Sequence, residues 1–261
     1  MKSPSALRLY VFPHAGGSQL LFREWAASFP PEWRFLPQDY PGHGLLAGEE
    51  PFDDADALVD WFLGRLHTEL GDPGAPFAFF GHSMGSLVAY ELTRRLVGEG
   101  RRAPVWLGLS GCGAPYAKRS RGETGELTDT ELRRRLIRLG GTPPRILDDP
   151  ELWSVFAPVI RADTTLVANW RAPQNVSPLP VPLTVFHGTA DVLAPQGPLE
   201  EWAECSTDFV GVRRFDGGHF YFQDDPARLA AAITGDIRRS LVRAAAGRHS
   251  KLAGEPGHSR S

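Results

Sequence analysis

The chain has 261 residues, of which 42% are hydrophobic, and its 28 basic and 31 acidic side chains leave a net charge of −3. This length fits one large α/β domain or two small ones, and the hydrophobic fraction can fill a substantial core. The small net charge excludes a global electrostatic attraction to nucleic acid or to an anionic membrane. No stretch reaches the roughly 18 consecutive apolar residues of a membrane span.

The start of the chain and its cysteines lead us to expect a cytoplasmic protein. The first residues, MKSPSALRLY, lack the apolar run of a signal peptide. Cys112 and Cys205 have neither metal-ligand spacing nor the density of a disulfide framework. The end of the chain is polar and without periodicity, so we expect residues 247–261 to be a disordered tail after a domain over residues 1–246.

Short apolar runs alternate with longer amphipathic segments, which is typical of an α/β fold with a mostly parallel sheet flanked by helices. The predicted strands are residues 7–12, 34–37, 76–80, 105–109, 182–187 and 209–215. The predicted helices are residues 20–29, 54–71, 86–97, 200–205 and a closing helix from Asp225.

The alternation of strands and helices is interrupted at about residues 112–178, where helical pieces are separated by proline and glycine and no strand is convincing. Thr128 and Glu131 form the capping box of one helix. A second helix starts at Pro150, and Pro158 should break or kink it. We therefore expect a helical insertion in the domain.

The segment GHSMG, residues 81–85, matches the pattern in which a serine lies at a sharp turn between a strand and a helix. Glycines on both sides of Ser83 permit this turn, which pushes the serine hydroxyl out of the sheet. Such a serine can instead serve only as the N-cap of the helix. The predicted strand before the motif and the predicted helix after it favour a nucleophile.

A serine hydroxyl is a weak nucleophile, so it needs a base, and the base needs a carboxylate that holds its tautomer. In this arrangement the expected chain order is Ser, Asp, His. His219 follows the last predicted strand, after two glycines, where a tight loop would carry its imidazole over the carboxyl edge of the sheet. We predict His219 to be the base rather than a surface histidine without a role.

Several aspartates lie between the serine and the histidine, and the candidates are Asp163, Asp191, Asp208 and Asp216. Asp191 directly follows a predicted strand at the active edge of the sheet. Asp208 precedes the last strand, at the wrong end, while Asp163 in the insertion and Asp216 beside the histidine would need special geometry. The positions favour Asp191.

The tetrahedral oxyanion of acyl transfer needs preorganised donors, and one is ordinarily the backbone N–H after the nucleophile, here Met84. The second donor should come from FPHAGGS, residues 12–18, whose glycines let the backbone approach a ligand. Either Ala15 or His14 can present this N–H. His14 and His43 could also be metal ligands, but no partner has suitable spacing, so we expect no metal.

Five segments in order, FPHAGGS, YPGHG, GHSMGSLVAYEL, HGTADVLAP and GGHFYF, resemble the type II thioesterases of polyketide synthases and nonribosomal peptide synthetases. The resemblance covers most of the chain and implies an α/β-hydrolase fold with a helical lid. It implies the triad Ser83, Asp191 and His219, and the oxyanion donors Ala15 and Met84. Related fused domains often carry the acid after an earlier strand, but GLSGCGAP has no carboxylate there, which also supports Asp191.

The resemblance further implies a substrate and a partner. The substrate is an acyl group on the phosphopantetheine arm of an acyl or peptidyl carrier protein, and the activity is hydrolysis of that thioester. No cofactor is expected. A carboxylesterase or acyltransferase would use the same triad, and a scaffold that binds acylated carrier protein without cleaving it is the remaining alternative.

The lid implied by the resemblance carries apolar and basic side chains. Its apolar residues either line an acyl channel or pack the lid, and most should pack: Leu132, Leu136, Ile137, Leu139, Trp153, Phe156, Ile160 and Val167. Its basic residues either meet an acidic carrier protein or form a solvated face: Lys118, Arg119, Arg121, Arg133, Arg134, Arg135 and Arg138.

Overall fold

The structure is a computed structural model that describes residues 6–72, 74–115, 127–172, 177–193 and 199–253. Within these residues a six-stranded sheet has the order β2-β1-β3-β4-β5-β6, and every neighbouring pair is parallel. The strands are β1 (Arg8–Phe12), β2 (Arg34–Pro37), β3 (Phe77–His82), β4 (Leu107–Ser110), β5 (Leu179–Gly188) and β6 (Ser206–Phe215). The prediction of a parallel α/β sheet is confirmed.

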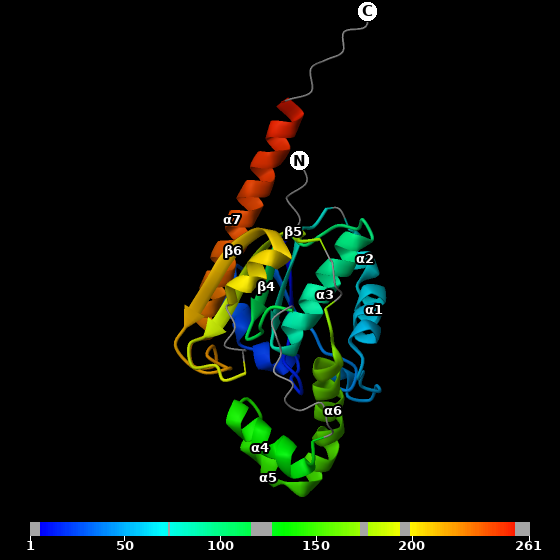
Figure 1. Ribbon diagram of the computed structural model, residues 1–261. Coiled ribbons are helices and arrows are strands. Elements are labelled where there is room, and N and C mark those ends of the chain that lie inside the picture. Colours follow the sequence, from blue (N-terminus) through cyan, green and yellow to red (C-terminus); the bar gives the residue numbers. More distant parts are fainter. Residues whose placement is uncertain (1–5, 73, 116–126, 173–176, 194–198, 254–261) are drawn as a thin grey trace, which may run out of the picture.

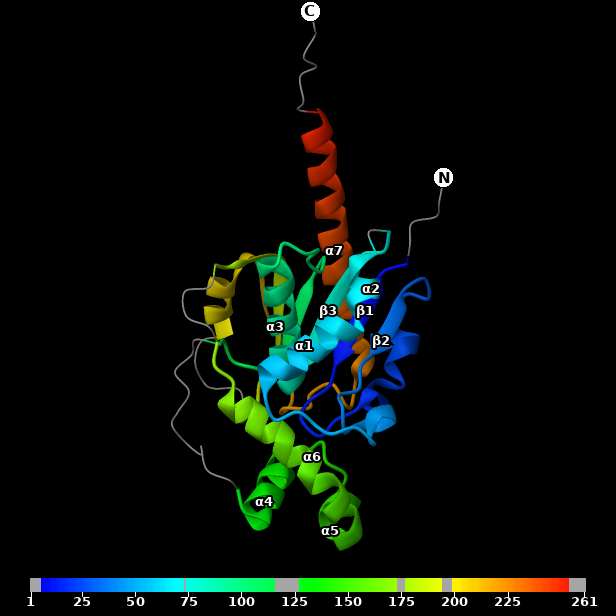
Figure 2. The same ribbon diagram turned by 90° about the vertical axis from the view of Figure 1, so that its right-hand side faces the viewer.

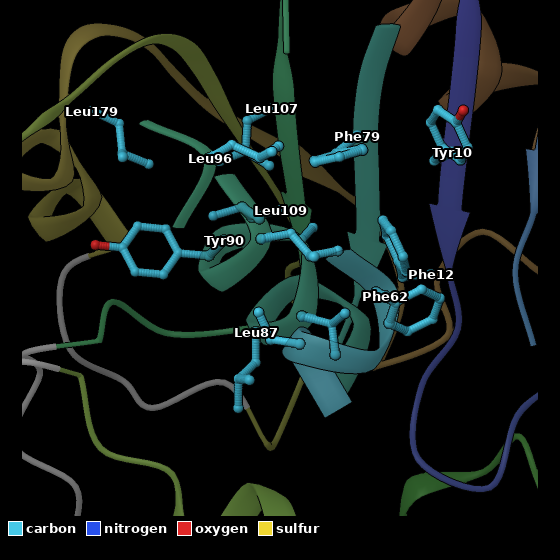
Figure 3. Close-up of a cluster of buried hydrophobic side chains, with 14 of the residues drawn as sticks. Tyr10, Phe12, Phe62, Phe79, Leu87, Tyr90, Leu96, Leu107, Leu109 and Leu179 are labelled. Atoms are coloured by element: carbon cyan, nitrogen blue, oxygen red, sulfur yellow. The ribbon is translucent and has the colours of Figure 1, made fainter. Parts of the chain in front are cut away.

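Alternating side chains of the strands fill two cores, one on each face of the sheet. In β1, Tyr10 and Phe12 belong to one cluster, whereas Leu9 and Val11 belong to the other. Figure 3 shows the first cluster, in which the rings of Phe12 and Phe62 meet edge to face with centroids 5.3 Å apart.

The helices cover these two faces. Helices α1 (Ala55–Arg65) and α3 (Met84–Gly98) cover the first face, while α7 (Pro226–Ala253) covers the other (Figures 1 and 2). Asp54 caps α1 by accepting a hydrogen bond from the Ala57 N–H at 2.9 Å.

Two helical predictions on the N-terminal side are wrong in detail. The helix expected at residues 20–29 is instead two 3-10 helices, Gln19–Phe22 and Trp25–Ser28. Phe22 ends the first of these and Trp25 starts the second, and their buried rings contact each other with centroids 5.0 Å apart. The helix expected at 54–71 is divided at Leu66, and its second part is α2 (His67–Gly71).

The predicted start of the tail is also wrong, because α7 continues to Ala253 and residues 247–253 are helical. Arg, Lys, Leu and Ala in this stretch are good helix formers, and they extend an existing helix across Gly247. Residues 254–261 lie outside the described residues. No helix in the described parts of the chain is long and apolar enough to cross a membrane.

The helical insertion lies between β4 and β5, as predicted, and forms α4 (Asp129–Leu139), α5 (Pro144–Asp148) and α6 (Pro150–Asn169). The capping box of Thr128 and Glu131 opens α4. In Figure 1 these helices lie below the sheet, beyond the carboxyl ends of its strands. We call α4, α5 and α6 the lid.

The lid has a hydrophobic cluster of its own. Its buried members are Leu132, Leu136, Leu147, Trp153, Ala157 and Ile160. Pro158 lies inside α6 but does not break it. Burial of residues on both sides of Pro158 outweighs the loss of one helical hydrogen bond.

Candidate active site

The turn between β3 and α3 holds Ser83 in a strained conformation. Its φ of 56° is the only positive value among the non-glycine residues that the structure describes. Ser83 occupies the N-cap position of α3, yet its side chain makes no capping hydrogen bond. Its backbone N–H donates to the Ser110 carbonyl at 2.7 Å. The turn is therefore fixed by the backbone and leaves the hydroxyl unused by the helix, which argues against a serine that acts only as a cap.

The first glycine of the GHSMG segment is required by the tightness of this turn. A β-carbon on Gly81 would lie 2.0 Å from the carbonyl oxygen of Gly85, far inside any real contact. Only glycine at position 81 lets the strand end and the helix start come this close.

The loops that follow β5 and β6 are joined by their backbones. The Thr189 N–H donates to the Phe215 carbonyl, and the Ala190 N–H donates to the Gly217 carbonyl, each at 2.8 Å. Residues just beyond these two strands are thereby brought together, although they are far apart in the sequence.

His219 and Asp191 meet at this junction. The Nδ1 atom of His219 lies 2.8 Å from Oδ2 of Asp191, and both residues are buried. Oδ1 of Asp191 accepts a hydrogen bond from the Leu193 N–H at 2.8 Å. A carboxylate only accepts, so Nδ1 of His219 donates, and the lone pair of Nε2 is left to take a proton. This is the tautomer that a general base needs.

The other three aspartates are placed elsewhere. Asp163 lies in the lid helix α6 and contacts His43 and Gly16. Asp208 lies near the amino end of β6, where it pairs with Arg243 at 3.0 Å. Asp216 is exposed.

A buried polar network, which the sequence did not reveal, lies beside His219. Nδ1 of His82 is 2.9 Å from Oγ of Ser110, which is 2.8 Å from the Tyr221 hydroxyl. The ring of His82 lies 4.7 Å from that of His219, centroid to centroid. Burial, with the nearby imidazoles of His219 and His14, holds the pKa of His82 well below its ordinary value. A neutral His82 therefore adds no like charge beside His219.

The loop after β1 lies beside the turn that holds Ser83. In the sheet Phe12 is paired with Gly81, so residues 13–19 leave β1 next to the end of β3. The strand order reverses direction between β1 and β3, and ligands of parallel sheets bind at such a switch point. Met84 is the first residue of α3, so its N–H is one that no intrahelical carbonyl accepts.

The two histidines that were weighed as metal ligands have other surroundings. Burial, followed by the charges of His219 and His43, lowers the pKa of His14 to about 3. His43 pairs with Asp163 at 2.9 Å. Among the described residues no group of three or more metal-ligating side chains is close enough to hold an ion.

Most of the apolar lid side chains named from the sequence are packed, and the others are half-buried or exposed. Four of them belong to the lid cluster: Leu132, Leu136, Trp153 and Ile160. Val167 packs against the core on the first face of the sheet, the one shown in Figure 3. Leu139 is half-buried, whereas Ile137 and Phe156 are 64% and 37% exposed. The prediction that most of these side chains pack the lid is confirmed.

The basic residues of the lid are only partly free to meet a partner. Arg133 lies over the Trp153 ring at 4.2 Å and donates to the Leu147 carbonyl. Arg134 and Arg138 are exposed, and Arg135 is half-buried. Lys118, Arg119 and Arg121 lie outside the described residues.

Comparison with known proteins gives one consistent family. Residues 7–238 match the model of the thioesterase domain. The chain is 31% identical over 242 residues to the gramicidin S biosynthesis protein GrsT of Aneurinibacillus migulanus, covering 93% of each chain.

Solved structures agree with this match. The RedJ thioesterase of the prodiginine pathway of Streptomyces coelicolor superimposes with a TM-score of 0.78 and 32% identity, over 90% of this chain and 87% of that one. YbtT, a type II thioesterase of the yersiniabactin pathway, gives a TM-score of 0.79 and 28% identity, over 92% and 96%. These likenesses confirm the expected α/β-hydrolase fold.

Proposed function

Because the chain belongs to the thioesterase domain family, we propose that it hydrolyses acyl thioesters through a triad of Ser83, His219 and Asp191. The observation that carries this proposal is the 2.8 Å contact between Nδ1 of His219 and Oδ2 of Asp191. It lies at the same edge of the sheet as the strained turn at Ser83. A serine without a side-chain capping bond and a histidine with its Nε2 lone pair available are the two reactants that acyl transfer needs.

The first step forms an acyl-enzyme. Nε2 of His219 takes the proton of the Ser83 hydroxyl while the serine oxygen attacks the thioester carbonyl carbon. The tetrahedral intermediate then expels the thiolate, which receives that proton from His219 and leaves as a thiol. Asp191 stays ionised and stabilises the imidazolium that forms in between.

The second step releases the acid. His219 takes a proton from a water molecule, and the hydroxide attacks the acyl-serine carbonyl. Collapse of the second tetrahedral intermediate returns the proton to the Ser83 oxygen and frees the carboxylic acid. In both steps the backbone N–H groups of Ala15 and Met84 stabilise the oxyanion. The scheme uses side chains, backbone and water, and so requires neither metal nor cofactor.

The acyl group comes, on this proposal, from the phosphopantetheine arm of an acyl or peptidyl carrier protein of a modular synthase in the cytoplasm. The support is that YbtT is described as a type II thioesterase of an NRPS/PKS pathway, while GrsT and RedJ are named for gramicidin S and prodiginine biosynthesis. Arg134 and Arg138 on the exposed face of α4 suit an acidic carrier surface.

The decisive experiment follows an acylated carrier protein by intact-protein mass spectrometry. With the enzyme the carrier should lose its acyl mass and keep its phosphopantetheine arm. Ser83→Ala should reduce turnover on the order of 10⁶-fold, whereas Ser154→Ala, at an exposed serine of the lid, should leave it unchanged.

A set of further assays separates the alternative functions. A panel of acyl carrier protein, acyl N-acetylcysteamine and a p-nitrophenyl ester distinguishes thioester from oxygen-ester chemistry. Turnover of the oxygen ester alone would replace the proposal with a carboxylesterase. Transfer of the acyl group to an alcohol rather than to water would indicate an acyltransferase. A folded enzyme that binds acyl carrier protein but whose Ser83 is not labelled by a fluorophosphonate would be a scaffold.

A further inference from the structure

A buried carboxylate of the lid helix faces the main body of the protein. Asp163 in α6 is 2% exposed, and its helical neighbours Ile160 and Leu166 are 3% and 0% exposed. Their spacing of three residues puts Asp163 on the apolar face of the helix. A carboxylate is costly to bury unless it is paired and hydrogen-bonded. The partners of Asp163 therefore decide what this position does.

The two hydrogen-bonding partners of Asp163 among the described residues lie outside the lid. Its Oδ2 accepts a hydrogen bond from the Gly16 N–H at 2.6 Å and lies 2.9 Å from Nε2 of His43. The Nδ1 atom of His43 lies 3.0 Å from the Pro41 carbonyl oxygen. A carbonyl and a carboxylate only accept, so both ring nitrogens of His43 donate and the ring is an imidazolium.

The electrostatics agree with this assignment. Burial by itself would lower the pKa of His43, but the hydrogen bond to Asp163 and its charge, together with the Pro41 carbonyl and the charge of Asp39, outweigh burial and raise that pKa. The pair is neutral as a whole. Asp163 can thus hold the backbone at Gly16 without leaving an uncompensated negative charge beside an oxyanion.

The N–H group that Asp163 holds belongs to the residue after Ala15. The same loop is held at its two ends by the segment before the 3-10 helix at Gly44–Leu46. The Tyr40 hydroxyl donates to the Pro13 carbonyl at 2.7 Å, and Asp39 accepts from the Gln19 N–H at 2.7 Å. Between these ends the Gly17 N–H donates to the His14 carbonyl at 2.9 Å, and Ala15 packs against the core on the first face of the sheet. The lid adds the hydrogen bond to the Gly16 N–H.

The lid also supports this part of the loop by direct contact. Gly16 has a φ of +74°, and a β-carbon there would lie 2.9 Å from Cγ1 of Ile160. Helix α6 therefore meets the backbone at Gly16 with one apolar side chain and one carboxylate. Displacement of α6 would release both contacts together.

We propose that Asp163, neutralised by His43, is a positioning residue that fixes Gly16 and thereby aims the Ala15 N–H at the oxyanion. The inference rests on the proposed function, in which Ala15 is an oxyanion donor. It makes docking of the lid helix and completion of the oxyanion hole a single event.

The test compares Asp163→Ala and Asp163→Asn with a matched control, Asp236→Asn. Asp236 is also a buried helical carboxylate, 1% exposed, but Arg213, Arg239 and Thr184 bind it in α7 on the other face of the sheet. Each folded variant is assayed with acyl N-acetylcysteamine for kcat and KM. Each is also titrated with an alkyl trifluoromethyl ketone, which adds to a serine and places an oxyanion in the hole.

Loss of the Gly16 anchor should lower kcat of Asp163→Ala by about 10- to 100-fold, with KM changed by less than about threefold. The inhibition constant for the trifluoromethyl ketone should rise by a similar factor. Asp163→Asn keeps an acceptor for Gly16 but loses the charge, so its defect should be smaller. Asp236→Asn should lower the melting temperature and leave both readouts at the parental value.

Parental kcat and parental ketone affinity in folded Asp163→Ala would overturn the proposal. If that variant fails to fold, His43→Gln replaces it, because it removes the neutralising charge from outside the lid. Parental values there would overturn the proposal equally. An active Ser83→Ala enzyme would instead refute the proposed function itself, so the two failures are distinguishable.

Discussion

The backbone of Gly85, in the first turn of α3, lies against the carbonyl group of Phe12 at the end of β1, where a β-carbon would come within 2.1 Å of the carbonyl oxygen. Gly85→Ala should therefore push α3 away from β1 and disturb the turn at Ser83. We expect a large loss of soluble protein or of melting temperature together with activity. Gly98→Ala in the same helix meets nothing within 4 Å and should stabilise the protein by up to about 1 kcal/mol. Thermal melts of both variants check the pair, and equal stability would contradict the contact.

Removal of the charge on Asp191 tests the tautomer of His219. Asp191→Asn offers an amide in place of the carboxylate and can hold the imidazole in the wrong tautomer, so kcat should fall by about 10⁴-fold. The control is Asp208→Asn, at the opposite end of the sheet, which should keep parental kcat. Steady-state kinetics on acyl N-acetylcysteamine measure both. A parental kcat in Asp191→Asn would assign the acid elsewhere.

Acid stability depends on histidines that are buried in the neutral form. The pKa of His82 lies well below its ordinary value because burial and nearby imidazoles disfavour its charge. Below about pH 6.5 the unfolded chain then binds more protons than the folded one, so stability falls as the pH falls. His82→Phe should flatten this dependence between about pH 6.5 and pH 4.5. Urea unfolding across this range measures it, with the exposed His67→Gln expected to keep the parental slope.

The contribution of His43 to stability should change with pH in the opposite direction. Its pKa is raised in the folded protein, because Asp163, the Pro41 carbonyl and Asp39 together outweigh the effect of burial. Its contribution to stability is therefore complete below the unfolded value of about 6.5 and is lost as the pH rises through the raised pKa. The difference in unfolding free energy between the parent and His43→Gln should shrink as the pH rises above about 6.5 and passes through the raised pKa. A difference that grows with pH would show that the ring is neutral.

The two cysteines should differ in reactivity. Cys205 is 2% exposed, and burial raises the pKa of its thiol to about 11, whereas Cys112 is half-buried. A disulfide reagent such as DTNB should label Cys112 in the native protein and both thiols in guanidinium. Mass spectrometry of Cys205→Ala, which should show the same native labelling, identifies the reactive residue. Rapid native labelling of Cys205 would contradict its burial.

Features set by neighbouring residues could be predicted from the sequence. The turn at Ser83 depends on Gly81 and Gly85, and the position of Asp191 depends on the strand just before it. The capping box of α4 is equally local. By contrast, Phe22 and Trp25 lie three residues apart, a spacing that fits a helix of either period, so the sequence pattern did not distinguish one α-helix from two 3-10 helices.

The role of Asp163 could not be predicted, because Gly16 and His43 are 147 and 120 residues away in the chain. From the sequence alone, Asp163 is only a weak candidate for the acid of the triad. One signal was present: an aspartate on the apolar stripe between Ile160 and Leu166 is a charge that some partner must balance.

The lid cluster around Leu132 and Trp153 is separate from the two cores that pack on the sheet. Apart from Ile160, which contacts the backbone at Gly16, its members can be substituted with compensation inside the lid and without repacking around the strands that carry the catalytic residues. Evolution can therefore vary the cover of the acyl site and the chemistry beneath it at different rates. Exchange of lids between relatives should follow the same boundary, provided that each transplanted lid keeps the aspartate that meets Gly16.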